Sequence, residues 1–121
     1  MRVDNLSGDG VIIASDNNVI TNSLIHAGNT GISLDGATNA IIESNTVHCE
    51  TGPCVYSQNS TGTLIKNNNL TLSDPSLDAI EANGDTPVIS YNCILGMLSP
   101  ASLAHKGTIF AGPGYVNAAG G

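Results

Sequence analysis

Two histidines stand where they could hold a metal ion together. His26 and His48 lie 22 residues apart, at equivalent places in consecutive copies of a repeat described below, so we expect them about 5 Å apart on neighbouring strands. Imidazole binds transition metals, but zinc sites usually take three or four ligands. Cys49 comes next, although adjacent strand residues point to opposite faces. The pattern favours a stacked histidine pair over a metal site, and no cofactor is expected.

The acids best placed for catalysis are Asp35 and Glu81. Each ends a short predicted strand, and the two strands lie about two coils, or ~9.6 Å, apart. That separation would suit an inverting glycosidase. The coil between them supplies Tyr56 and Ser57, which complete no acid–base set. We therefore interpret both acids as surface carboxylates and predict no catalytic residue.

The cysteines leave two readings open. Cys49 and Cys54 bracket four residues that include Gly52 and Pro53, and such a loop could close through a disulfide. A disulfide would agree with an oxidising compartment. Cys93 would then be a buried thiol or an intermolecular link. The intrachain bridge and free thiols are equally compatible with the spacing.

The amino-acid composition limits the classes of partner that the protein is expected to bind. Ten acidic residues against three Lys and Arg give a net charge of −7, whereas phosphate binding needs clustered cations, so we expect no nucleic acid. No stretch approaches the ~20 apolar residues of a membrane span, so no membrane insertion is expected. The surface is built from Asn, Ser, Thr and Gly, which favours an extracellular or cell-surface location. With no Trp and one Phe, a stacking platform for sugar rings is hard to assemble, and an extracellular glycan stays a possible partner.

A repeat organises most of the chain. Four segments align, at residues 19–25, 41–47, 64–70 and 88–94, in steps of 22, 23 and 24 residues. Three of their columns are uniform in character. The first column is aliphatic, with Val19, Ile41, Leu64 and Val88; the second is Ile20, Ile42, Ile65 and Ile89; the fifth is Ser23, Asn45, Asn68 and Asn92. A second short strand precedes each copy, at residues 11–13, 32–34, 54–56 and 79–81.

This repeat predicts an all-β solenoid of about four coils. A unit of ~20–25 residues cannot bury its own apolar face, but stacking places each Ile on the previous one. The strands of successive coils then pair about 4.8 Å apart. The Asn column suits this arrangement in two ways: Asn tolerates the left-handed backbone of a sharp bend, and stacked amides can hydrogen-bond along the axis. The ladder is therefore formed by the second and fifth columns.

The pattern, seen best in residues 39–47, resembles the pectate-lyase-like right-handed parallel β-helix superfamily over roughly residues 8 to 96. Residues 112–117 resemble the segment that often follows the last coil in secreted bacterial β-helix proteins. The resemblance implies the fold, but that superfamily includes lyases, hydrolases, epimerases, tailspikes, adhesins and non-catalytic modules. The Asp-Asp and Gly-His-Gly signatures of pectin hydrolases, and the Arg or Lys base of the lyases, are missing here.

We expect one domain over residues 1–121. Residues 1–8 would form an incomplete first coil, residues 9–96 the repeats, and residues 97–121 an irregular C-terminal cap or docking segment. The first eight residues supply little apolar material for a cap, whereas the C-terminal stretch carries Leu103, Ile109, Phe110 and Tyr115. The bare N-terminal end fits either a fragment of a longer β-helix or copies stacked head to tail.

These features favour a non-catalytic, extracellular structural module that associates with other copies of itself, as a filament or a surface scaffold. The first column is a candidate lateral interface if it faces outward, and part of the core if the strand bends there. The alternative function, from the resemblance alone, is a fragment of a polysaccharide lyase or glycoside hydrolase that acts on an extracellular glycan.

Overall fold

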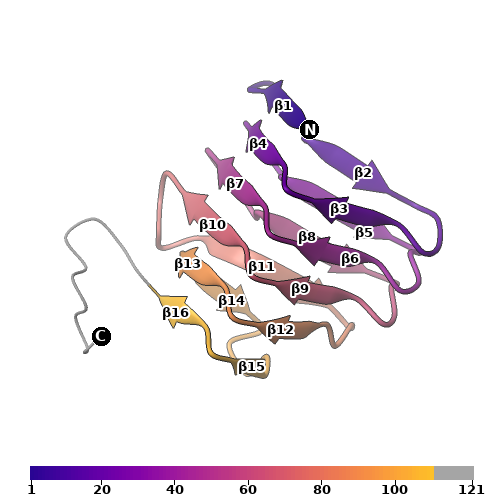
Figure 1. Ribbon diagram of the computed structural model, residues 1–121. Coiled ribbons are helices and arrows are strands. Elements are labelled where there is room, and N and C mark those ends of the chain that lie inside the picture. Colours follow the sequence, from indigo (N-terminus) through magenta and orange to yellow (C-terminus); the bar gives the residue numbers. More distant parts are fainter. Residues whose placement is uncertain (111–121) are drawn as a thin grey trace.

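The computed structural model describes residues 1–110, and the regular secondary structure within them consists entirely of β-strands. Successive strands enter three sheets in turn, so each sheet receives one strand per coil (Figure 1). Sheet A contains β1 (Arg2–Asn5), β4 (Leu24–Ala27), β7 (Thr46–Cys49), β10 (Asn69–Leu72), β13 (Cys93–Leu95) and β16 (Ile109–Phe110). Sheet B contains β2 (Val11–Ile13), β5 (Ile32–Asp35), β8 (Val55–Gln58), β11 (Asp78–Asn83) and β14 (Met97–Ser99). Sheet C contains β3 (Val19–Thr21), β6 (Ile41–Glu43), β9 (Leu64–Lys66), β12 (Val88–Ser90) and β15 (His105–Lys106).

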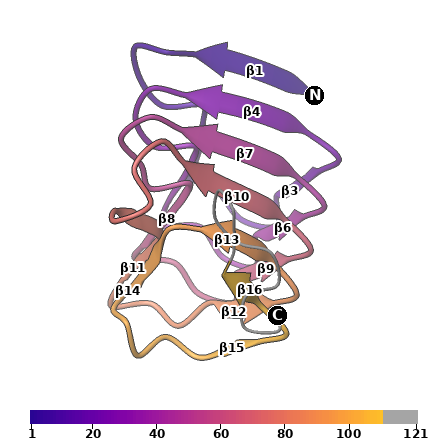
Figure 2. The same cartoon turned by 90° about the vertical axis from the view of Figure 1, so that its left-hand side faces the viewer.

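All strand pairings are parallel, and each joins a coil to the next. Figure 2 shows the strands of sheet A, from β1 to β13, one above another along the axis. The predicted β-solenoid is confirmed, and its register is that of the repeat. Ile42, for example, lies between Ile20 and Ile65.

The isoleucine column forms one wall of the core. Ile20, Ile42, Ile65 and Ile89 are all buried, while the residues on either side of each are exposed or half-buried. This alternation follows from the two-residue period of a strand. Burial of each isoleucine side chain contributes about 1.5–3 kcal/mol relative to exposure. The column therefore supplies much of the energy that holds the coils together.

The polar column forms a continuous buried ladder beside this wall. Its members, Ser23, Asn45, Asn68 and Asn92, are buried. Asn68 is representative: its side-chain Oδ1 accepts the backbone N–H of Asn45 over 2.9 Å, and its Nδ2 donates to the Ile42 carbonyl over 2.9 Å. Its own N–H donates to Oδ1 of Asn92, again over 2.9 Å. The amides therefore satisfy backbone groups that the strands leave unpaired at the corner.

The left-handed backbone predicted for the ladder falls on a different residue, so that detail was wrong. The residues with positive φ at this corner each precede a ladder residue; they are Asn22, Ser44, Asn67 and Tyr91, with φ of 52°, 60°, 56° and 56°. The backbone turns at the residue with positive φ, and the side chain of the next residue, the ladder residue, points into the core. The buried Asn is therefore required for its hydrogen bonds rather than for its tolerance of positive φ.

The aliphatic first column faces outward. Val19 and Val88 are 58% and 60% exposed, and Ile41 and Leu64 are half-buried. The strand does not bend at this position, so the column lies on the outer face of sheet C. Of the two readings that the sequence left open, the outward one is correct; a role as an interface stays a prediction.

The coil continues beyond the last recognisable repeat. Strands β14, β15 and β16 add to the three sheets, so residues 97–110 are more regular than expected. His105 occupies the place of the column isoleucine opposite Ile89, which explains why the pattern could not be read there. Leu98 and Leu103 are buried against the core, as a cap would require. The predictions for residues 111–121, Tyr115 among them, lie outside the described residues.

Candidate functional site

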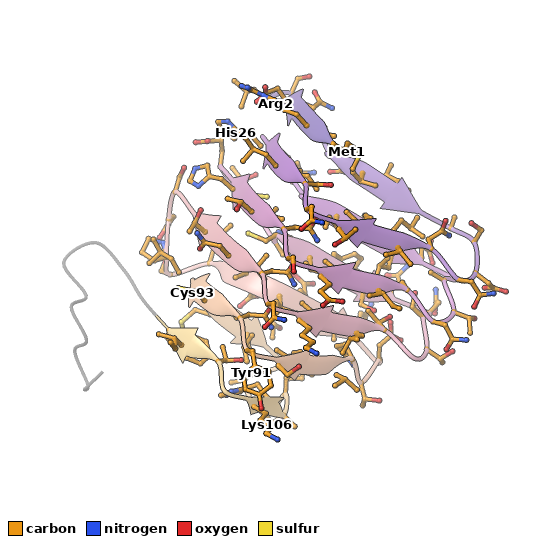
Figure 3. All side chains as sticks on the ribbon, viewed as in Figure 1. Met1, Arg2, His26, Tyr91, Cys93 and Lys106 are labelled. Carbon is orange, nitrogen blue, oxygen red and sulfur yellow. The ribbon has the colours of Figure 1, made fainter. Side chains whose placement is uncertain are left out.

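A column of polar side chains crosses the outer face of sheet A. The register aligns Asp4, His26, His48 and Thr71 on β1, β4, β7 and β10. His26, His48 and Thr71 alternate with buried neighbours and Asp4 with half-buried ones, so all four point away from the core. The pleat repeats every two residues, and this repeat sets the direction of all four side chains. In Figure 3, His26 lies at the outer surface near the N-terminal coils.

The two histidines meet as predicted, with ring centroids 5.1 Å apart and planes at 70°. Glu50 joins them from the turn after β7. Its Oε2 lies 2.7 Å from Nε2 of His26 and 3.4 Å from Nε2 of His48. Glu50 is two residues beyond His48, so the strand alternation that hides Cys49 turns Glu50 outward. That two-residue spacing is the signal by which the sequence could have found the carboxylate.

Neighbouring oxygens hold this group in position. Nδ1 of His48 lies 2.7 Å from Oγ1 of Thr71, and the Ser73 hydroxyl donates to Oε1 of Glu50 over 2.7 Å. Nδ1 of His26 lies 3.9 Å from Oδ1 of Asp4. The hydrogen bond from His26, followed by the one from Ser73, lowers the pKa of Glu50 below its usual value. The carboxylate is therefore held in its charged form, which can accept hydrogen bonds or bind a cation.

The acids singled out for glycan hydrolysis do not come together. Asp35 pairs with Gln58, whereas Glu81 pairs with Tyr56. The two acids therefore stand in different columns of sheet B, two residues apart along the strand as well as two coils apart. By strand geometry that offset brings their Cα separation to about 12 Å. This arrangement lends no support to a catalytic pair.

Cys49 and Cys54 lie side by side inside the coil, and both are buried free thiols. The neighbouring Cys49 thiol, together with burial, raises the pKa of Cys54 far above its usual range. The Cys54 thiol also donates to the carbonyl of Thr71 over 3.3 Å. The Cys54 thiol is therefore protonated and unreactive, and the disulfide between the two cysteines stays a prediction that their proximity permits.

Thiol counting tests that bridge. In folded, reduced protein we expect a thiol reagent to modify the half-buried Cys93 first, while Cys49 and Cys54 react only as the protein unfolds. Protein purified without reductant and then denatured should expose a single reactive thiol if the bridge has formed. Three reactive thiols in that sample would show that the bridge is absent.

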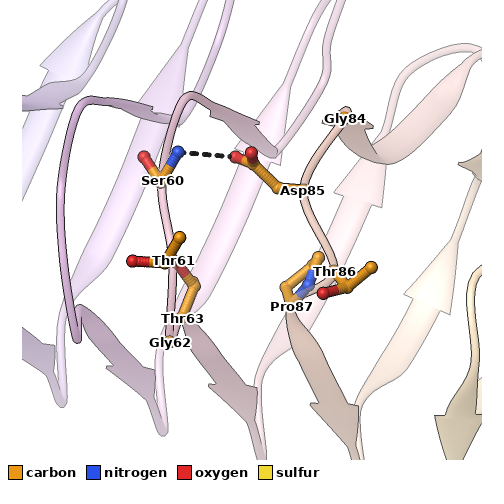
Figure 4. Close-up of a pocket in the computed structure, with 8 residues that line it drawn as sticks. All are labelled: Ser60, Thr61, Gly62, Thr63, Gly84, Asp85, Thr86 and Pro87. Atoms are coloured by element: carbon orange, nitrogen blue, oxygen red, sulfur yellow. Dashed lines mark hydrogen bonds between the residues drawn. The ribbon is translucent and has the colours of Figure 1, made fainter.

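A small hollow lies between two neighbouring turns, at residues 60–63 and 84–87 (Figure 4). Its volume is about 130 Å³, well below the ~300–1,000 Å³ of most ligand pockets. Its one carboxylate, Asp85, accepts hydrogen bonds from the Ser57 hydroxyl over 2.7 Å and from the Ser60 N–H over 3.0 Å. Asp85 therefore ties two coils together, and the hollow offers no free charged group to a ligand.

Stacked parallel coils with a buried amide ladder define a β-helix protein. Residues 1–109 match the family described as right handed beta helix region, and the chain belongs to that family. The match agrees with the resemblance to pectate-lyase-like β-helices seen in the repeat. No curated protein matches the chain, and no solved structure does. Within the described residues, no helix could span a membrane.

Proposed function

We propose that this chain is a non-catalytic structural β-helix module that associates with other copies of itself at the cell surface or outside the cell. The observation that carries the proposal is the aliphatic column on the outer face of sheet C. Val19 and Val88 expose more than half of their surface there, and the half-buried Ile41 and Leu64 lie between them. A continuous apolar stripe on an outer sheet face is the kind of surface that proteins bury in contacts.

A second copy suits this stripe because the face is self-complementary. Consider two copies packed face to face about a two-fold axis parallel to the strands, midway between β6 and β9. That symmetry sets Ile41 against Leu64 and Val19 against Val88. It also sets Glu43, which neighbours the stripe, opposite Lys66 of the other copy. Apolar contact and opposite charges then coincide, as an isologous interface requires.

The solenoid edges offer a second contact between copies. Among residues 1–110, β1, β2 and β3 each pair with a strand on one side only. Ile12 and Leu6 are 68% and 64% exposed at this end. Edge strands readily accept another strand, and a head-to-tail contact that does not close produces a filament. The two contacts together would give filaments that adhere side by side.

The proposed location has its support in composition and chemistry. Only 11% of residues are charged, and Asn, Ser, Thr and Gly supply the polar surface. Such a surface relies on neutral hydrogen-bonding groups rather than on lysine and glutamate. The adjacent Cys49 and Cys54 could form a bridge in an oxidising compartment.

Size-exclusion chromatography with negative-stain microscopy tests the proposal. We expect the purified chain to elute as concentration-dependent oligomers and to form stacks or filaments. Val88→Asp places a charge in the stripe and should reduce lateral association about tenfold or more, since a buried unpaired charge is costly. Leu24→Asp changes an exposed leucine on sheet A and should leave association intact. A wild-type chain that stays monomeric at high concentration would contradict the proposal.

A further inference from the structure

We propose that His26, His48 and Glu50 form a binding site for a divalent transition-metal ion, with Zn²⁺ as the ion that fits best. The site lies on the outer face of sheet A and is separate from the stripe on sheet C. Each residue offers one ligand atom, and these atoms lie within 4.8 Å of one another. The three side chains come from two consecutive coils and the turn that follows the second.

The distances suit a small tetrahedral ion. Bonds of about 2.0–2.1 Å from a tetrahedral metal place its ligand atoms roughly 3.3 Å apart. Nε2 of His48 and Oε2 of Glu50 are 3.4 Å apart, and Nε2 of His26 is 2.7 Å from the same oxygen. A modest rotation of the His26 ring opens the shorter contact. His26 pairs directly with His48 on β4 and β7, so the strand spacing already holds both rings side by side.

The orientation of the rings is the second observation in favour of a metal. Nε2 of His26 points at Oε2 of Glu50, and Nε2 of His48 lies 3.4 Å from the same oxygen and 3.2 Å from the Ser73 hydroxyl. Nδ1 of His48 has Thr71 as its partner, and Nδ1 of His26 faces Asp4. Metal-binding histidines characteristically give their other nitrogen to a carboxylate or hydroxyl, which fixes the tautomer. A simple stacked pair would not require one carboxylate oxygen to reach both Nε2 atoms.

The donor set selects the kind of ion. Two imidazoles and one carboxylate suit zinc and its neighbours, whereas Ca²⁺ and Mg²⁺ prefer oxygen ligands. Three protein ligands leave a fourth position for water or another small ligand. His26, His48 and Glu50 have 37%, 37% and 43% of their side-chain surface exposed. An ion can therefore enter from solvent without opening the fold.

Isothermal titration of the full chain with Zn²⁺, after treatment with a chelator, tests the site. We expect one equivalent to bind, and we expect Co²⁺ to give the intense visible absorption of a tetrahedral complex. His26→Gln and Glu50→Gln should each weaken Zn²⁺ binding by roughly 10- to 100-fold. His105→Gln removes a histidine that lies outside the cluster and should leave binding unchanged. Ca²⁺ should give no saturable binding.

Thermal unfolding supplies an independent readout. Zn²⁺ bound only to the folded chain should raise Tm, and this rise should be lost in Glu50→Gln. Because Glu50 lies in a turn with 43% of its side-chain surface exposed, that variant tests the site even if His26→Gln unfolds. The absence of saturable Zn²⁺ binding would overturn the proposal. Equal binding by the wild type and Glu50→Gln would also overturn it, and the cluster would then be a hydrogen-bond network.

Discussion

Replacing Asn68 with alanine is expected to lower the free energy of unfolding by about 4 kcal/mol. The side chain is buried, and its loss removes the acceptor for the Asn45 N–H and the donor to the Ile42 carbonyl. Each buried polar group left without a partner costs about 1–3 kcal/mol. Alanine can replace neither bond, and the corner is too enclosed for water to reach both groups easily. Denaturant unfolding of the variant and the wild type measures the difference.

Asn69→Ala is the matched control. Asn69 is the next residue, but its side chain points outward from β10 and is exposed. We expect this variant to change the free energy of unfolding by no more than about 0.5 kcal/mol. Equal effects of the two substitutions would mean that the ladder contributes nothing beyond the strand itself. A loss confined to Asn68→Ala would identify the amide ladder as a structural element of the fold.

Gly31→Ala is expected to destabilise the protein by about 3 kcal/mol through overpacking. Gly31 lies just before β5, where the coil turns close over its neighbours. A Cβ there would stand 2.5 Å from Cγ1 of Val47 and 2.6 Å from the Cys54 carbonyl oxygen. Two coils would have to move apart to admit it. A lower denaturation midpoint at an unchanged slope would report this loss.

Gly8→Ala serves as the control for that substitution. A Cβ at Gly8 meets nothing closer than Nδ2 of Asn5, at 3.4 Å. The added methyl group should be neutral, or stabilise slightly by restricting the unfolded chain. If Gly31→Ala proved equally harmless, the close approach of the coils at that position would be wrong.

The sequence predicted the fold because stacking imposes its period on the residues. Columns such as Ile20, Ile42 and Ile65 are visible without coordinates, since each member fills the same place in the core. The pairing of His26 with His48 followed from the same register. Wherever two side chains sat in repeat positions, their proximity could be predicted.

Features outside the repeat could not be found in this way. Glu50 lies in the turn beyond β7, where the columns end and only the two-residue alternation remains. His105 breaks the isoleucine column, so β15 and the strands beside it went unrecognised. The residue with positive φ is Ser44 rather than Asn45. The column pattern shows which side chains share a position in each coil, but it does not show at which residue the backbone turns the corner.

The two proposed surfaces can be tested separately. The histidine site belongs to sheet A and the aliphatic stripe to sheet C. Glu50→Gln should therefore weaken zinc binding without changing self-association, and Val88→Asp should weaken self-association without changing zinc binding. Coupled losses would mean that a variant has perturbed the coil as a whole.

The most direct test of the structural role is a charge reversal at the proposed lateral interface, followed by sedimentation equilibrium. Glu43→Lys makes the net charge two units less negative than −7, a change that by itself favours association. The two-fold arrangement predicts the opposite: Glu43→Lys places like charges against Lys66 of the second copy and should weaken association about tenfold. Adding Lys66→Glu should restore it. If the double variant associated no better than Glu43→Lys alone, or if the wild type did not associate, the account of self-association through sheet C would be contradicted.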